Sequence, residues 1–156
     1  LFFILCIGFV IIFFIDLKHF IIPNEITYPL ILIGFFKSFD PNLNIFLFPN
    51  FINSLIGGLF GYIIIWLIIF IYKKLRNKEG MGLGDAKLLS VIGFWFGWIS
   101  IPFVIFFSSA VALISVIPDL IKNKKKLSSQ IPFGPYLIIG CLIFLFLNEQ
   151  IKLFLN

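Results

Sequence analysis

Long apolar runs alternate with short polar segments along the whole chain. The runs cover residues 1–15, 26–38, 51–72, 85–98, 99–121 and 132–147. A helix needs about 20 apolar residues to cross the hydrocarbon core of a bilayer, and irregular backbone is not tolerated in contact with lipid. The pattern therefore predicts an all-α protein, a polytopic membrane helical bundle of about six transmembrane helices that forms a single membrane-embedded domain over residues 1–156.

The composition indicates membrane embedding and argues against other classes. Hydrophobic residues make up 61% of the chain and charged residues 12%, whereas a soluble domain is about half apolar and a quarter charged. A net charge of +5 could indicate nucleic-acid binding. The positive charges fall between the apolar runs, however, where they act as topology signals. We therefore expect the lipid bilayer as a partner and no nucleic acid.

The basic residues also predict an orientation. Lys18 and the clusters at residues 73–78 and 122–126 follow the first, third and fifth apolar runs, while Lys37 and Lys152 fall on the opposite side. Short loops rich in Lys and Arg stay in the cytoplasm. The pattern predicts a multi-pass protein of the inner (cytoplasmic) membrane with its N-terminus outside.

Two carboxylates stand at the predicted cytoplasmic ends of apolar runs. Asp16 ends the first run, and Asp85 opens the fourth, directly after the glycine-rich segment 80–84. An ionisable residue in a membrane segment is a functional hypothesis by default. Two carboxyl groups about 3 Å apart share one proton, so that one can activate water while the other donates to a scissile carbonyl. Glycines let backbone pass close to such a pair. The sequence leaves open which aspartate is the acid and which the base.

These motifs resemble the type IV prepilin peptidases, membrane aspartic proteases with a Gly-x-Gly-Asp motif. The matching pieces are Asp16 with Ile22-Pro23-Asn24, the segment from Glu79 to Leu88, and Ile131-Pro132-Phe133-Gly134-Pro135, in the expected order over nearly the whole chain. The resemblance implies that Asp16 and Asp85 are catalytic. It also implies a supporting motif of Glu79, Gly80, Gly82, Gly84, Lys87, Pro23, Pro132 and Gly134. Asn24 stands where many relatives have an aspartate.

The resemblance implies a substrate as well. The expected function is cleavage of the leader peptide of type IV prepilins or pseudopilins at the cytoplasmic face, with no cofactor. One rival within the class is a preflagellin-type peptidase with another substrate. Two rivals from other classes are a small proton-coupled transporter that uses the same carboxylates and a non-catalytic scaffold. A proton relay should cross the bilayer, whereas both aspartates fall on one predicted side.

Several of these residues also have structural interpretations. Asp85 could cap a helix, because aspartate is favoured at helix starts. Asp16 could pair with Lys18 or Lys87, and Lys87 could serve as an ion-pair partner or a topology charge. The Gly57-x-x-x-Gly61 spacing, repeated further on at residues 93 and 97, suits close helix packing. We expect that packing to be intramolecular, and the sequence leaves the oligomeric state open.

The cysteines and the single histidine argue against a metal site. Cys6 and Cys141 lie in apolar runs without a Cys-x-x-Cys spacing, and His19 is the only histidine. Many bacterial members of the resembled family also methylate the mature pilin and carry two Cys-x-x-Cys pairs in a separate domain. We therefore expect this chain to cleave without methylating. Because it begins at Leu1 within an apolar run, we also expect it to lack its native N-terminus.

Overall fold

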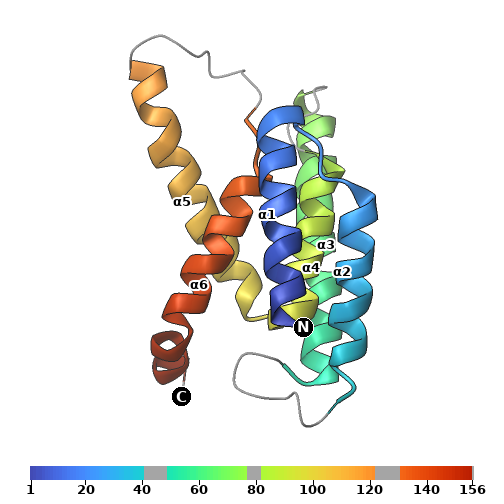
Figure 1. Ribbon diagram of the computed structural model, residues 1–156. Coiled ribbons are helices and arrows are strands. Elements are labelled where there is room, and N and C mark those ends of the chain that lie inside the picture. The colour runs from blue at the N-terminus through green and yellow to red at the C-terminus, as the bar shows by residue number, and fades with distance from the viewer. Residues whose placement is uncertain (41–48, 77–81, 122–130, 156) are drawn as a thin grey trace.

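The computed structural model describes residues 1–40, 49–76, 82–121 and 131–155, and every regular element among them is an α-helix. The helices are α1 (Phe2–His19), α2 (Asn24–Lys37), α3 (Phe51–Arg76), α4 (Leu83–Phe96), α5 (Ser100–Ile121) and α6 (Gly134–Leu155). Successive helices run in opposite directions, so the ends of α1, α3 and α5 lie at the same end of the bundle as the starts of α2, α4 and α6 (Figure 1). We call this the site end. The prediction of an all-α helical bundle is confirmed.

Among the described residues, three helices are long and apolar enough to cross a membrane by themselves. They are α1, α3 over Phe51–Leu75 and α5 over Ser100–Ile117. The α2 and α4 helices have 14 residues each, which is shorter than the roughly 20 residues of a full span. The chain is thus a membrane protein whose shorter helices pack among longer ones.

Some helix ends differ from the predicted boundaries. The α1 helix continues past residue 15 to His19, which places Asp16 inside its last turn and not in a connection. Its basic last turn suits the negative end of a helix, and Phe20 ends it by taking a left-handed backbone with φ of 57°. The α2 helix begins at Asn24, two residues before the predicted apolar run, and contains Pro29. The α6 helix runs beyond residue 147 to Leu155.

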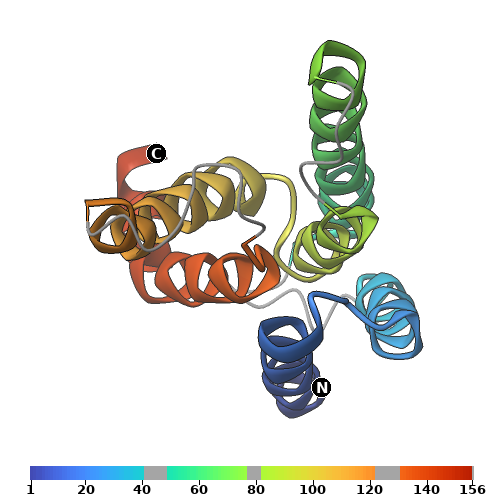
Figure 2. The same cartoon turned by 90° about the horizontal axis from the view of Figure 1, so that it is seen from above.

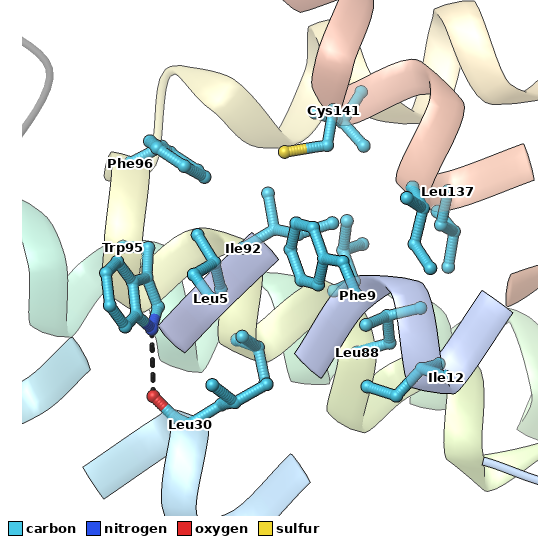
Figure 3. Close-up of a cluster of buried hydrophobic side chains, with 14 of the residues drawn as sticks. Leu5, Phe9, Ile12, Leu30, Leu88, Ile92, Trp95, Phe96, Leu137 and Cys141 are labelled. Atoms are coloured by element: carbon cyan, nitrogen blue, oxygen red, sulfur yellow. Dashed lines mark hydrogen bonds between the residues drawn. The ribbon is translucent and has the colours of Figure 1, made fainter. Parts of the chain in front are cut away.

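The α4 helix forms the centre of the bundle. It packs against α3, α2, α5 and α6, and Figure 2 shows it between the α5–α6 pair on one side and α2 and α3 on the other. A helix that is apolar all round is expected to be buried, and Leu88, Ile92 and Trp95 are fully enclosed. In Figure 3 the α4 side chains meet those of α1 and α6, among them Phe9 and Leu137.

Glycines bring α3 and α4 into backbone contact. A Cβ atom added to Gly57 would lie 2.5 Å from the Gly93 carbonyl oxygen, and one added to Gly61 would lie 2.7 Å from that of Leu89. Both distances are too short for a real carbon atom, so only glycine fits. The small-residue spacing therefore serves intramolecular packing, as interpreted from the sequence. Gly97 has a different role, because it ends α4 with φ of 81°.

Candidate active site

The two aspartates lie at the site end of the bundle. Asp16 is in the last turn of α1 and Asp85 is in the first turn of α4. Both are almost completely buried, with exposed fractions of 4% and 6%. The charge of Asp16 is close enough to act electrostatically on Asp85. The fold therefore brings together two carboxyl groups that are far apart in the chain.

Asp16 is held by the start of α6. The backbone N–H of Gly134, the first residue of that helix, donates a hydrogen bond of 3.0 Å to Asp16 Oδ2. The start of a helix carries unpaired N–H groups and partial positive charge, both of which suit a carboxylate. The Asp16 backbone carbonyl in turn accepts the Phe20 N–H at 2.9 Å, where α1 ends. This geometry ties the end of α1 to the start of α6.

Asp85 is held by the start of its own helix. The backbone N–H of Gly82, which precedes α4, donates a 3.3 Å hydrogen bond to Asp85 Oδ2. The interpretation of Asp85 as a helix-capping residue is thus correct for this oxygen. A cap of this kind also fixes where the carboxyl group points, so the structural role and a chemical role are compatible.

Ile22 lies between the two sets of site residues. A Cβ atom on Gly84 would lie 2.9 Å from Ile22 Cβ, and one on Gly134 would lie 3.1 Å from Ile22 Cδ1. Gly84 is helical, and Gly97 is the only described glycine with positive φ. Gly84 therefore does not need the positive φ that glycine allows; the close approach of Ile22 is what leaves no room for a side chain there.

Ile22 was not singled out from the sequence. It belongs to the Ile22-Pro23-Asn24 segment, but an isoleucine in a mostly apolar chain carries no signal by itself. It is buried, with an exposed fraction of 8%, although it belongs to the short connection between α1 and α2. The one sequence feature that could have indicated it is its position directly before Pro23, at the end of the connection between α1 and α2.

Two of the remaining supporting residues, Pro23 and Lys87, make contacts at the start of α2. Pro23 precedes α2 with φ of −69°, and its carbonyl accepts the Thr27 hydroxyl at 3.2 Å. Lys87 Nζ donates to Asn24 Oδ1 at 2.5 Å and lies 5.3 Å from the centre of the Tyr28 ring. Lys87 thus joins α4 to the start of α2, and within the described ranges it forms no ion pair with Asp16.

Other predicted positions are less informative. Pro132 is partly buried just ahead of α6. Glu79 and Gly80 lie outside the described residues, as do the lysines at 122–126. Within the described part of the chain, no three His, Cys, Asp or Glu side chains gather as they would around a metal ion. The chemistry that this site offers is that of two neighbouring carboxyl groups.

Comparison with known proteins identifies the family of this sequence. The model of the type IV leader peptidase family matches residues 3–117, which include both aspartates. A protein of Pseudomonas aeruginosa named prepilin leader peptidase/N-methyltransferase is 37% identical over 138 residues, which is 88% of this chain and 46% of the relative. Relatives of the same name from Aeromonas hydrophila and Dichelobacter nodosus are 36% and 33% identical, over 88% and 85% of this chain and 46% and 44% of their own lengths.

The chain therefore spans about half the length of these curated relatives. No solved structure gives a significant match. The family model nevertheless covers well over half of the chain, and the relatives align over most of it. On this evidence the chain belongs to the type IV leader peptidase family.

Proposed function

We propose that this chain is an aspartic endopeptidase that cleaves the leader peptide of type IV prepilins or pseudopilins at the cytoplasmic face of the inner membrane. The observation that carries the proposal is that Asp16 and Asp85 are both buried at one end of the bundle, close enough for the charge of one to act on the other. The names of the relatives supply the class of substrate.

The two carboxyl groups provide what peptide hydrolysis needs. Two carboxyl groups that interact electrostatically tend to share one proton, because a negative charge on one opposes a negative charge on the other. The ionised group takes a proton from water, and the water oxygen bonds to the scissile carbonyl carbon. The protonated group gives its proton to the carbonyl oxygen. When the tetrahedral intermediate collapses, the C–N bond breaks and the amine leaves with a proton from the pair.

The position of the pair suits a substrate that is itself held in the membrane. The resembled family cuts its substrate just before a hydrophobic helix. That helix would lie in the bilayer beside the bundle, with the scissile bond near the site end. Lys18, Lys73 and Lys74 are exposed at this end, which favours a cytoplasmic location. These lysines would repel a leader peptide that is itself basic. Insertion of the substrate helix into the membrane is therefore what mainly brings the substrate to the enzyme.

The test is a cleavage assay on the purified chain in lipid vesicles. A prepilin is incubated with the wild-type chain, Asp16→Asn, Asp85→Asn and the control Asp40→Asn, which changes an exposed aspartate beyond the end of α2. Mass spectrometry of the product gives the cleaved bond. We expect cleavage by the wild type and the control alone. Cleavage by both site variants would overturn the assignment, and cleavage of a preflagellin but not a prepilin would change the substrate.

A further inference from the structure

Gly134, the first residue of α6, donates a hydrogen bond to Asp16, and its lack of a side chain leaves room for the Asp16 carboxyl group. The Gly134 N–H donates to Asp16 Oδ2 at 3.0 Å. A Cβ atom on Gly134 would lie only 2.6 Å from the same oxygen, well inside the normal distance between a carbon and an oxygen. Any side chain at this position would therefore displace the carboxyl group from its donor.

This contact stabilises negative charge on Asp16. A hydrogen bond from a backbone N–H to a carboxylate is a strong one because its acceptor is charged, and a helix start adds partial positive charge. The bond is buried from solvent. Among the described residues no cation forms an ion pair with Asp16. Among the described residues, the start of α6 is therefore the main group that stabilises a negative charge on Asp16.

The corresponding contact of Asp85 is weaker. Its bond from Gly82 is longer, at 3.3 Å, and only partly buried. When two carboxyl groups compete for one negative charge, the charge resides where it is better stabilised. This comparison favours the ionised form of Asp16 and the protonated form of Asp85.

From this geometry we infer that Gly134 is a positioning residue that holds Asp16 as the ionised carboxylate. Asp16 is then the general base, which takes the proton of water, and Asp85 is the general acid, which gives its proton to the scissile carbonyl oxygen. The inference rests on the proposed function, and it adds an assignment of acid and base that the motif alone leaves open.

Within the part of the chain that the structure describes, few other titratable groups lie near Asp16. Asp85 of α4 is close enough to interact with it electrostatically. On its own helix, Lys18 and His19 are exposed. Lys87 of α4 is engaged by Asn24 at the start of α2. On α6, the Tyr136 hydroxyl accepts a hydrogen bond from Ser115 of α5. The ionisation of Asp16 is therefore expected to respond mainly to Asp85 and to the Gly134 N–H.

Two substitutions separate the space from the hydrogen bond. Gly134→Ala adds a methyl group and keeps the N–H, whereas Gly134→Pro adds carbon atoms and removes the N–H at a first helical position that tolerates proline. The control is Gly8→Ala on α1, where the new methyl group would meet Leu30 Cδ1 at 2.7 Å, the end of a flexible side chain. Cleavage kinetics are measured from pH 4 to pH 9, roughly the range over which coupled carboxyl groups titrate.

We expect Gly134→Ala to lower kcat by about 100-fold with little change in KM, because a small displacement of a catalytic group has that scale of effect. Gly134→Pro should also move the acidic limb of kcat/KM to higher pH than in Gly134→Ala, because the anion of Asp16 has lost its donor. Gly8→Ala should resemble the wild type. A shift confined to the alkaline limb would make Asp16 the acid and overturn the assignment.

A measurement without substrate keeps this inference separate from the proposed function. In an Asp85→Asn background, infrared spectra of chains with labelled aspartate, corrected with the Asp16→Asn variant, follow the protonation of Asp16. Its midpoint should lie at higher pH in Gly134→Pro than in Gly134→Ala, whether or not a prepilin is cleaved. Equal midpoints would overturn the role of the N–H. If Gly134→Pro does not accumulate in the membrane, wild-type kcat in Gly134→Ala would overturn the positioning role.

Discussion

The two ends of α4 are held in different ways. Near its C-terminus, buried side-chain donors from α2 and α3 bind its carbonyl groups, and its own Trp95 donates to α2. These bonds are Lys37 Nζ to the Trp95 carbonyl at 2.8 Å, Ser54 Oγ to the Phe94 carbonyl, and Trp95 Nε1 to the Leu30 carbonyl at 2.9 Å, the last drawn in Figure 3. At its N-terminus, Asp85 receives a backbone N–H from Gly82.

The difference shows how a short buried helix can present a reactive group. Hydrogen bonds between helices are a means of fixing them in lipid, where water does not compete. Those bonds anchor α4 far from the carboxyl pair. At the site end, backbone N–H groups orient the carboxylates, and glycines let neighbouring segments approach. A functional group at the end of a well-fixed element is positioned more accurately than one on a loop.

The largest effect should come from the carboxyl pair itself. Asp16→Asn and Asp85→Asn should each lower kcat by at least about 10³-fold, because either change removes one half of a unit that works as a pair. The double variant should be no worse than the singles, for the same reason. Initial rates on a prepilin test this, with membrane content of each variant as the control. Multiplied losses in the double variant would show that the aspartates act independently.

A large effect is also expected at Gly84. Gly84→Val would push a branched side chain into Ile22, whose Cβ lies 2.9 Å from the position of the new Cβ. We expect kcat to fall by about 100-fold through displacement of the site. Combining Gly84→Ala with Ile22→Ala makes room and should recover activity relative to Gly84→Ala alone. No recovery would mean that Gly84 matters for a reason other than this contact.

The sequence predicted the helices more accurately than the contacts of the site. Apolar runs must become helices in lipid, because every backbone polar group needs a partner there, and the six runs indeed correspond to the six helices. The end of α1 was misplaced, because Phe20 ends it with a left-handed backbone where a glycine would usually signal the stop.

The contacts that hold the carboxyl groups left little trace in the sequence. The Gly134 N–H reaches Asp16 from a distant part of the chain, and a backbone donor has no residue type that could announce it. The glycine segment predicts a close approach of other parts of the chain, but it does not indicate that Ile22 is the residue that approaches Gly84. Such details depend on how the helices pack, which a pattern of apolar residues does not specify.

The C-terminal end of α4 should affect stability more than activity. Lys37→Met removes a buried charged donor from the Trp95 carbonyl, and leaving a buried polar group without its partner costs about 1–3 kcal/mol. We expect a lower midpoint in denaturant or heat, with kcat of the remaining folded protein within a factor of about three of the wild type. The double variant Lys37→Met with Trp95→Phe should be less stable still. A kcat loss as large as that of Gly84→Val would show that the two ends are coupled.

The smallest effect should come from Lys87, which joins the first turns of α4 and α2 at the site end. Its bond to Asn24 Oδ1 is solvent-exposed, and exposed pairs and cation–π contacts contribute about 0.5–1 kcal/mol. Lys87→Met should therefore lower stability by about that amount and change kcat only a few-fold. Asn24→Asp would turn the contact into an ion pair, and we expect a gain of at most about 1 kcal/mol that salt screens. Thermal midpoints at low and high salt test both variants, with Glu25→Gln as a neighbouring exposed control. A loss of activity in Lys87→Met comparable to that of the aspartate variants would mean that Lys87 takes part in the chemistry, and the contrast between the two ends of α4 would then need to include it among the reactive groups.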